Sequence, residues 1–204
     1  MESRQNPSCK RPYELGRRLE QTDHTRAAVL KAARAQLEKG GTRDFSMESL
    51  AKASGVTRQT IHNLFGTRSG VLETLFDQIA LDGGMERMRE VMMAGDADVM
   101  LEGFIAVFSN FWAKNRLLLK RIHGIAAVDP EFGKAIYARN QRRHMAAAHV
   151  MERIGASRKQ SEATACLVAL TSFEFFDALV ESLGTVEAAE KQLPGLIRRA
   201  LLKD

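Results

Sequence analysis

The stretch SMESLAKASGVTRQTIHNLF, residues 46–65, predicts two short helices joined by a turn at Gly55. Ser46 is suited to cap the first helix, because its hydroxyl can accept a hydrogen bond from an otherwise unpaired backbone N–H. Gly55 lies at the chain reversal, where a positive φ is common and a side chain is costly. Thr57 can cap the second helix as Ser46 caps the first. The pattern is typical of a helix-turn-helix unit, which lays its second helix in a DNA groove.

The second helix separates apolar from polar side chains. Its inward residues are Ile61, Leu64 and Phe65, which lie three and four positions apart on one face. Its outward residues can all form hydrogen bonds: Arg58, Gln59, Thr60, His62 and Asn63. Arginine can bridge two acceptors of guanine, Gln or Asn can bridge adenine, and Thr offers a hydroxyl and a methyl. Any solvated helix also exposes polar residues, so the turn alone is equally compatible with a protein that never contacts DNA.

The residues around this turn make the interpretation specific. From Thr25 to Asp77 the sequence resembles the DNA-binding domain of TetR-family transcriptional regulators. The matching pieces occur in the family's order and spacing: TRAAVLKAARAQLEKGG, TRDFSMESLAKASGVT, the recognition helix RQTIHNLF and GTRSGVLETLF. This resemblance implies a three-helix DNA-binding head and a longer helical body that dimerises and holds a ligand cavity. It also implies repression that a small molecule relieves.

We assign DNA contacts to polar residues of the head, namely Thr25, Arg26, Thr42, Ser46, Thr57, Arg58, Gln59, Thr60, His62, Asn63, Thr67 and Arg68. Two positions depart from the family pattern. His62 stands where the family usually has a phosphate-contacting Tyr, and Arg68 with Ser69 stands where it has a Lys and an acidic residue. Imidazole can still donate a hydrogen bond. Arg68 keeps a positive charge beside a helix N-terminus that Thr67 can cap, so we expect phosphate anchoring to be retained.

Charge is distributed unevenly along the 204 residues. Residues 1–70 hold 13 Lys and Arg against 7 Asp and Glu, a net charge of +6, whereas residues 71–204 hold 17 against 18, a net charge of −1. A basic surface attracts phosphate whatever the sequence, and could equally serve RNA or an anionic membrane. We predict an all-α chain with a basic mobile arm at 1–21, a helix-turn-helix domain at 22–70 and a helical ligand-binding and dimerisation domain at 71–204.

The body reads as a succession of helices. A fourth helix is expected from about 68 to 82, ending at Gly83 and Gly84. Further segments are predicted at 85–93, 97–113, 115–127, 130–154, 157–183 and 185–203. Asp129 followed by Pro130 is a helix start signal, and Pro194 with Gly195 should kink or split the last helix.

Apolar residues recur at three-to-four spacing along the last two predicted helices. Such helices can pair with their symmetry mates in a four-helix bundle, although the same stripe is also typical of a protomer's own core. With the resemblance, we predict a homodimer interface formed by Leu170, Phe173, Leu179, Val180, Leu183, Leu193, Leu196, Ile197 and Ala200.

Aromatic residues are concentrated in the body, where they could pack as core or line a pocket. For a fold whose body binds ligands, we predict a pocket formed by Phe104, Phe108, Phe111, Trp112, His123, Tyr137, Phe173 and Phe176. Candidate polar partners of the ligand are His123, His144, Arg121 and Arg139. The expected effector is small and mostly hydrophobic.

The sequence shows no glycine-rich phosphate loop, nucleophile elbow or metal-ligand spacing, so we predict neither catalysis nor a cofactor or metal. Cys9 and Cys166 lie far apart, and no signal peptide or membrane-length apolar run is present, which favours a cytoplasmic protein without a membrane partner. We expect a dimeric repressor that binds a near-palindromic DNA operator. The alternatives are a non-specific nucleic-acid binder or a helical scaffold, and, less favoured, an enzyme with a helical catalytic body.

Overall fold

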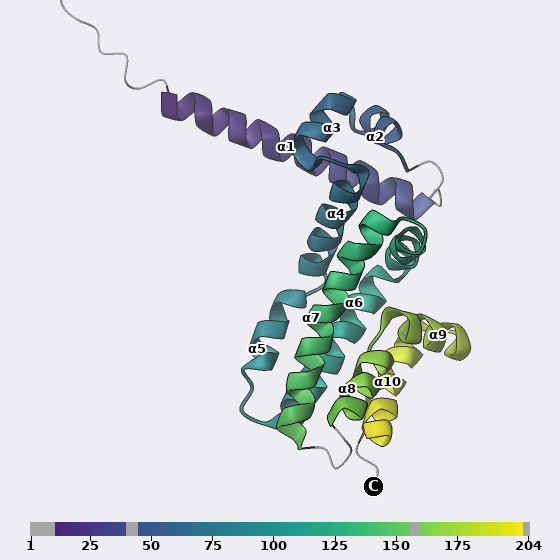
Figure 1. Ribbon diagram of the computed structural model, residues 1–204. Coiled ribbons are helices and arrows are strands. Elements are labelled where there is room, and N and C mark those ends of the chain that lie inside the picture. Colours follow the sequence, from purple (N-terminus) through teal and green to yellow (C-terminus); the bar gives the residue numbers. More distant parts are fainter. Residues whose placement is uncertain (1–10, 40–44, 156–159, 202–204) are drawn as a thin grey trace, which may run out of the picture. The chain divides into compact units, whose positions relative to one another are not determined.

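The computed structural model describes residues 11–39, 45–155 and 160–201, and every regular element in these ranges is a helix (Figure 1). The chain divides into two compact units, Met1–Thr74 and Leu75–Asp204. The first unit contains α1 (Arg11–Lys39), α2 (Met47–Ser54), α3 (Arg58–Phe65) and the start of α4 (Arg68–Asp82). The second contains the end of α4, η1 (Met85–Arg87), α5 (Met88–Met92), α6 (Ala97–Ala126), α7 (Pro130–Ile154), α8 (Gln160–Leu170), α9 (Phe173–Leu183) and α10 (Val186–Leu201). The predicted all-α fold, with a small head and a larger helical body, is confirmed.

The head has its own small core. Four apolar residues of α1 recur three and four positions apart and are buried: Val29, Leu30, Ala33 and Leu37. Leu50 and Ala51 of α2 and Ile61 of α3 are buried in the same unit. Because α2 and α3 have only eight residues each, their stability depends on this packing rather than on helix propensity.

Residues 11–21 were expected in a mobile arm, but they are helical and form the beginning of α1. The helix propagates backwards from the packed part of α1, since extending a helix by one residue costs far less than starting one. Residues 1–10 lie outside the described ranges. The boundary between the two units also falls four residues beyond the predicted one at 70.

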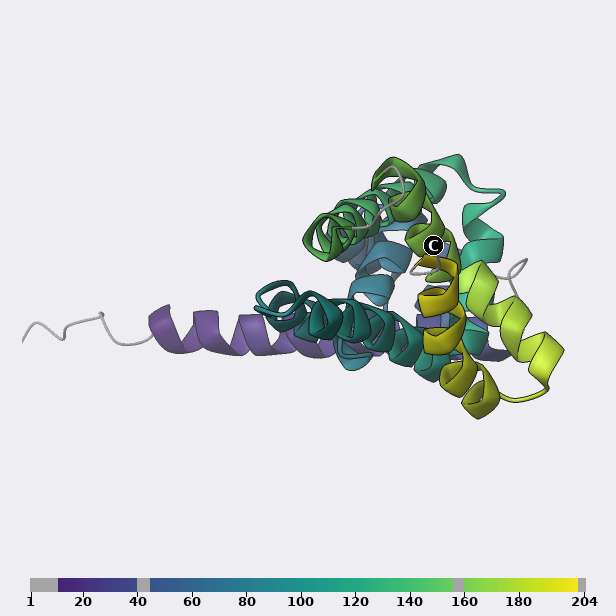
Figure 2. The same cartoon turned by 90° about the horizontal axis from the view of Figure 1, so that it is seen from below.

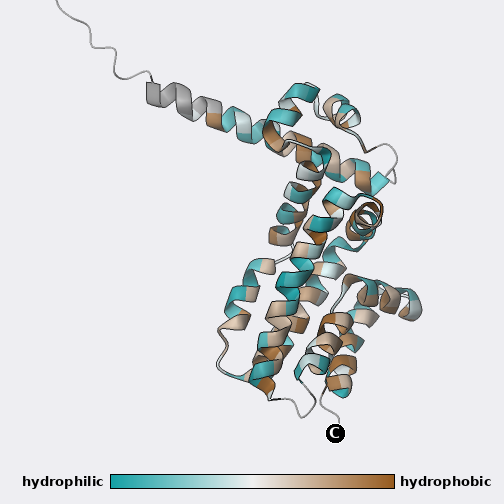
Figure 3. Ribbon diagram, in the orientation of Figure 1, coloured by the Kyte–Doolittle hydropathy of each residue, from teal (hydrophilic) through white to brown (hydrophobic). Residues whose placement is uncertain are grey.

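The second unit is built on two long helices, α6 and α7, against which α8, α9 and α10 pack. In Figures 1 and 2, α9 and α10 lie on the same side of this unit. Figure 3 shows that its helices carry hydrophobic and hydrophilic residues on different faces, as amphipathic helices do. The largest fully buried side chains of this unit include Phe104, Phe111, Phe132 and Phe176.

Predicted helix breaks are wrong at two positions. The expected segments at 97–113 and 115–127 form one helix, α6, because the amide of the buried Asn115 donates to the Phe111 carbonyl at 3.1 Å and is satisfied within the helix. Pro194 likewise lies inside α10 without splitting it.

The predicted single helix at 157–183 is also wrong, since α8 and α9 are separate helices bent by 53° at Thr171 and Ser172. Ser172 caps α9 by accepting from the N–H of Phe175 at 3.1 Å. The Thr171 carbonyl accepts from Trp112 Nε1 at 3.0 Å, so a side chain of α6 stabilises the break. Among the described helices, none alone is long and apolar enough to cross a bilayer, and α8 with α9 would qualify only as a bent pair.

Candidate functional site

Hydrogen bonds fix the turn between α2 and α3 at both helix ends. The Ser46 hydroxyl accepts from the N–H of Ser49 at 3.1 Å, and the Ser49 hydroxyl accepts from the N–H of Ser46 at 3.0 Å. Gly55 has a φ of 70°, in the left-handed region. The Thr57 hydroxyl accepts from the N–H of Thr60 at 3.1 Å and caps α3. The predicted caps and turn are confirmed.

The polar face of α3 is open to solvent. Arg58, Gln59, His62 and Asn63 are exposed, and Thr60 is half-buried. The Gln59 amide donates to Asn63 Oδ1 at 2.9 Å, which holds two potential base readers in a fixed relation. These side chains form a row of donors and acceptors of the kind that reads base edges.

Two arginines predicted to contact DNA act within the head. Arg26 of α1 donates from Nη2 to the carbonyl of Leu64 at 3.2 Å, and its guanidinium lies 5.0 Å from the centre of the Phe65 ring. It therefore neutralises the carbonyl end of α3. Arg68 donates from Nη1 to the carbonyl of Phe45 at 3.2 Å. Arg26 therefore supports the end of α3, whereas Arg68 joins the start of α4 to Phe45, just before α2.

The remaining predicted DNA contacts are placed differently. Thr25 is half-buried and donates to the Gln21 carbonyl within α1 at 2.8 Å. Ser46 and Thr57 are exposed helix caps. Thr67 is exposed, and its hydroxyl accepts from the N–H of Gly70 at 3.1 Å at the start of α4. Thr42 lies outside the described residues.

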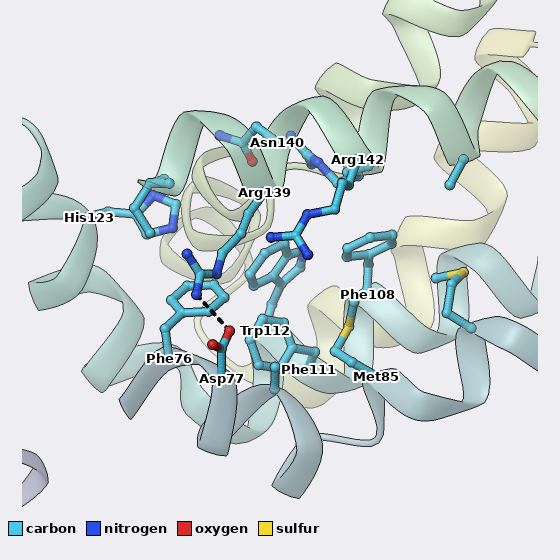
Figure 4. A pocket seen from close by; sticks show the side chains of 15 residues that line it. Phe76, Asp77, Met85, Phe108, Phe111, Trp112, His123, Arg139, Asn140 and Arg142 are labelled. Carbon is cyan, nitrogen blue, oxygen red and sulfur yellow. Dashed lines mark hydrogen bonds and ion pairs between the residues drawn. The ribbon is translucent and has the colours of Figure 1, made fainter. Parts of the chain in front are cut away.

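In the second unit, α4, α6 and α7, together with η1 and α5, line a partly open cavity of about 250 Å³ (Figure 4). Of the predicted ligand residues, Phe108, Phe111, Trp112 and His123 line it. The other four predicted ligand residues do not line this cavity. Phe104, Phe173 and Phe176 are buried in the core outside this lining, and Tyr137 is 65% exposed.

The aromatic cluster was expected either to pack as core or to line a pocket, and it does both, one on each side. The rings form a chain of contacts, with centres 4.9 Å apart for Phe104 and Phe108, 4.8 Å for Phe111 and Trp112, and 5.7 Å for Trp112 and Phe173. One side of this chain is packed core, and the other side is the cavity wall. The hydrogen bond from Trp112 to the Thr171 carbonyl fixes the indole ring between the core and the cavity.

Sequence reasoning missed most of the lining. The additional residues are Phe76, Asp77 and Ala80 of α4, Met85, Met88, and Ile136, Asn140, Arg142, Arg143 and Ala146 of α7. One signal was present in the sequence, since Ile136, Arg139 and Arg143 fall on one helix face at spacings of three and four. Because Ile136 faces the core, arginines on the same face of the helix indicate a polar site inside the second unit.

Charged groups gather along α7 and at the His123 end of the lining. Arg139, a predicted polar partner, lines the cavity and donates from Nη2 to Asp77 Oδ1 at 2.6 Å (Figure 4). His123 donates from Nδ1 to Glu174 Oε1 at 2.8 Å, and this hydrogen bond is the main reason that the pKa of Glu174 falls to about 2. The other two predicted partners, His144 and Arg121, do not line the cavity.

Arg143 is the most unusual group of the lining. It is only 9% exposed, and its Nε and Nη1 have no hydrogen-bond partner. Its guanidinium carbon lies 5.8 Å from the centre of the Phe108 ring. Burial lowers the pKa of Arg143, because desolvation penalises the charged form.

Comparison with known protein families finds a match in the head. Residues 29–75, which cover most of α1 together with α2, α3 and the start of α4, match the family described as bacterial regulatory proteins, tetR family. The head of this chain is a TetR-family domain. Members of this family regulate transcription by binding DNA, so the match supports a DNA-binding regulator. A search of curated proteins finds no match.

Solved structures share the fold of this chain over nearly its whole length. A TetR-family regulator from Syntrophomonas wolfei is 15% identical, with a TM-score of 0.70 over 89% of this chain and 96% of the other. NalD, the secondary repressor of the MexAB-OprM multidrug efflux pump in Pseudomonas aeruginosa, is 17% identical, with a TM-score of 0.66 over 90% and 98%. A transcriptional regulator from Saccharomonospora viridis in complex with choline is 15% identical, with a TM-score of 0.65 over 86% and 96%.

The predicted dimer stripe of this chain is divided between core and surface. Phe173, Val180, Leu193 and Ile197 are buried within the protomer's own second unit, so they cannot be the exposed surface that a second copy contacts. Leu170, Leu179, Leu196 and Ala200 are half-buried, and Leu183 is 42% exposed.

Over the described ranges, no three His, Cys, Asp or Glu side chains are grouped in a way that could hold a metal ion.

Proposed function

We propose that this protein is a homodimeric repressor that binds a near-palindromic operator through α3 and releases it when a small ligand occupies the cavity of the second unit. The observation that carries this proposal is the capped, exposed polar face of α3 in a TetR-family head. One neighbour of the same fold, NalD, is a repressor. Action on DNA also implies a cytoplasmic location.

Dimerisation accounts for the use of a single short recognition helix. An eight-residue helix reads only a few base pairs, whereas two copies about 34 Å apart can read successive major grooves of one operator. The partly exposed apolar residues of α8 to α10, Leu170, Leu179, Leu183, Leu196 and Ala200, support a second copy packing on this surface. The family typically forms such homodimers.

Helix α4 provides the route from ligand to DNA. It begins in the head's unit and ends in the second unit, where Phe76, Asp77 and Ala80 line the cavity. A ligand that fills the cavity therefore contacts α4 directly, without an intermediate helix. A preference of a few kcal/mol for the non-binding state is enough to release the operator.

The test is selection of binding sites from random duplex DNA at physiological salt, with the wild type, Arg58→Ala and Lys114→Ala in parallel. Arg58 is exposed on α3, whereas Lys114 is an exposed cation of α6 and controls for net charge. We expect the wild type and Lys114→Ala to enrich the same inverted repeat. Arg58→Ala should lose preference at one base pair per half-site, a cost of about 1 to 3 kcal/mol.

Two results would argue against the proposal. Enrichment of no sequence above a salt-sensitive background would make the head a non-specific nucleic-acid binder. Enrichment of a single half-site without its inverted copy would keep sequence-specific binding but rule out the dimer.

A further inference from the structure

Arg143 carries a buried charge that the protein leaves incompletely paired. Two of its guanidinium nitrogens, Nε and Nη1, are buried without a hydrogen-bond partner, and the side chain lines the cavity. A buried cation without a partner is unfavourable, and proteins ordinarily pair such a group or exclude it. Its persistence here is explained if an anionic group enters the cavity with the ligand.

The charges around Arg143 do not supply that anion. Three arginines line the cavity, Arg139, Arg142 and Arg143, whereas Asp77 is the carboxylate among the lining residues. Asp77 is bonded to Arg139 at 2.6 Å. Glu174 attracts Arg143 electrostatically, but its Oε1 is bonded to His123 and it leaves Nε and Nη1 of Arg143 unbonded. The lining therefore keeps an excess of positive charge.

The rest of the cavity is apolar and of defined size. Phe108, Phe111, Trp112 and Ile136 contribute hydrophobic wall, and Met85 and Met88 add flexible thioether side chains that adapt to shape. A dry apolar cavity of about 150 Å³ is large enough to bind benzene. The present cavity of about 250 Å³ therefore accommodates one substituted ring or an alkyl chain of similar volume.

We propose that the effector is an amphipathic monocarboxylate whose carboxylate binds Arg143 and whose apolar body lies against Phe108, Phe111 and Trp112. This inference rests on the proposed function, in which the cavity is the effector site, and it specifies the chemical class. The fork of the guanidinium offers parallel N–H donors that match a carboxylate. The Saccharomonospora viridis regulator of the same fold binds choline, a cation, and the arginine-rich lining here predicts the opposite preference.

The chain has a single tryptophan, Trp112, in the cavity wall, so its intrinsic fluorescence reports directly on occupancy. The full-length protein is titrated with two series of acids, phenylacetate to 5-phenylvalerate and hexanoate to decanoate, which separate aromatic from alkyl sources. The matching neutral amides and choline serve as comparison ligands. We expect at least one acid to saturate the signal, with its amide and choline at least about tenfold weaker.

Three variants, Arg143→Met, Arg143→Lys and the control Lys134→Met, identify the residue responsible for binding the acid. We expect Arg143→Met to weaken the best acid by about tenfold or more and its amide by less than about threefold, with partial recovery in Arg143→Lys. Lys134→Met removes an exposed cation of the same helix that does not line the cavity, and it should change the affinity for either ligand by less than about threefold. Circular dichroism melting verifies that each variant is folded.

The inference is overturned if no acid of either series binds, if amides bind as tightly as acids, or if folded Arg143→Met keeps full affinity for the acid. Binding of choline in preference to the acids would also overturn it, while leaving the cavity as the effector site. Operator selection without ligand tests the proposed function separately, so failure of one proposal is distinguishable from failure of the other.

Discussion

Arg139 of α7 donates from Nη2 to the carboxylate of Asp77 on α4 at 2.6 Å, and its guanidinium also lies 4.8 Å from the centre of the Phe76 ring. Both partners on α4 line the cavity. This contact joins α7, which carries Arg143, to the helix that continues into the head's unit. It therefore ties α7 to α4 beside the cavity.

We predict that Asp77→Asn weakens the coupling between ligand and DNA. The operator affinity without ligand divided by the affinity with ligand should be about fivefold smaller in the variant than in the wild type, a change of the size of a weak allosteric coupling. Stability should change by less than about 1 kcal/mol, because the Asp77 side chain is 68% exposed and its ion pair is screened. Fluorescence anisotropy with labelled operator measures the ratio, and an unchanged ratio would show that the pair plays no part in signalling.

Gly83 follows α4 directly, and a side chain there should damage the cavity wall. A Cβ at this position would lie 2.5 Å from the buried ring of Phe111 and 3.0 Å from the carbonyl of Ile79. Gly83→Ala should therefore lower the free energy of unfolding by about 1 to 3 kcal/mol. Gly124→Ala is the matched control, since a Cβ there meets nothing within 4 Å inside α6 and should stabilise by about 0.5 to 1 kcal/mol. Equal effects in urea unfolding would contradict the packing described at Gly83.

Arg26→Met should weaken DNA binding without altering sequence preference. Its guanidinium bonds the Leu64 carbonyl at the end of α3, so its loss removes support from the recognition helix rather than a base contact. We expect a loss of about 1 to 2 kcal/mol in the stability of the head and a uniform loss of affinity for all operator variants. Site selection with this variant should return the wild-type motif, whereas a changed motif would mean that Arg26 itself reads DNA.

Lowering the pH should remove the contribution of Glu174 to the stability of the fold. Its pKa is lowered in the folded protein to about 2 from an ordinary 4.5, with the hydrogen bond from His123 as the main cause. Since the folded pKa is depressed, the stabilisation is fully present above pH 4.5 and is lost as the pH falls toward 2. Glu174 has a 68% exposed side chain, so the effect should remain below about 1 kcal/mol. Urea unfolding of Glu174→Gln should differ from the wild type at about pH 6 and converge with it in acid.

Arg143→Met should raise the stability of the ligand-free protein. Methionine can occupy much of the same buried space without a charge that lacks partners. A gain of about 1 kcal/mol corresponds to a melting temperature higher by about 2 to 4 °C in a chain of this size. A lower melting temperature would show that Arg143 stabilises the fold through its contacts with Phe108 and Glu174.

The sequence by itself determined the head. Ser46, Gly55 and Thr57 act on backbone groups within four residues of themselves, so the two helices and their turn follow from local sequence alone. The exposed polar face of α3 follows equally, because the three apolar residues of an eight-residue helix fix which side is buried.

Only the tertiary structure decided the functions of residues whose partners lie far along the chain. Asp77 meets Arg139 across 62 positions, and Trp112 meets Thr171 across 59. Arg26 and Arg68 are basic residues in a DNA-binding head. Each nevertheless donates a hydrogen bond within the head, Arg26 to the carbonyl of Leu64 and Arg68 to the carbonyl of Phe45. In the same way, Phe108 and Phe173 look alike in sequence, but one lines the cavity and the other lies in the core outside it. Helical periodicity reports that a side chain faces inward, whereas the packing of separate helices decides whether it meets another side chain or an open cavity.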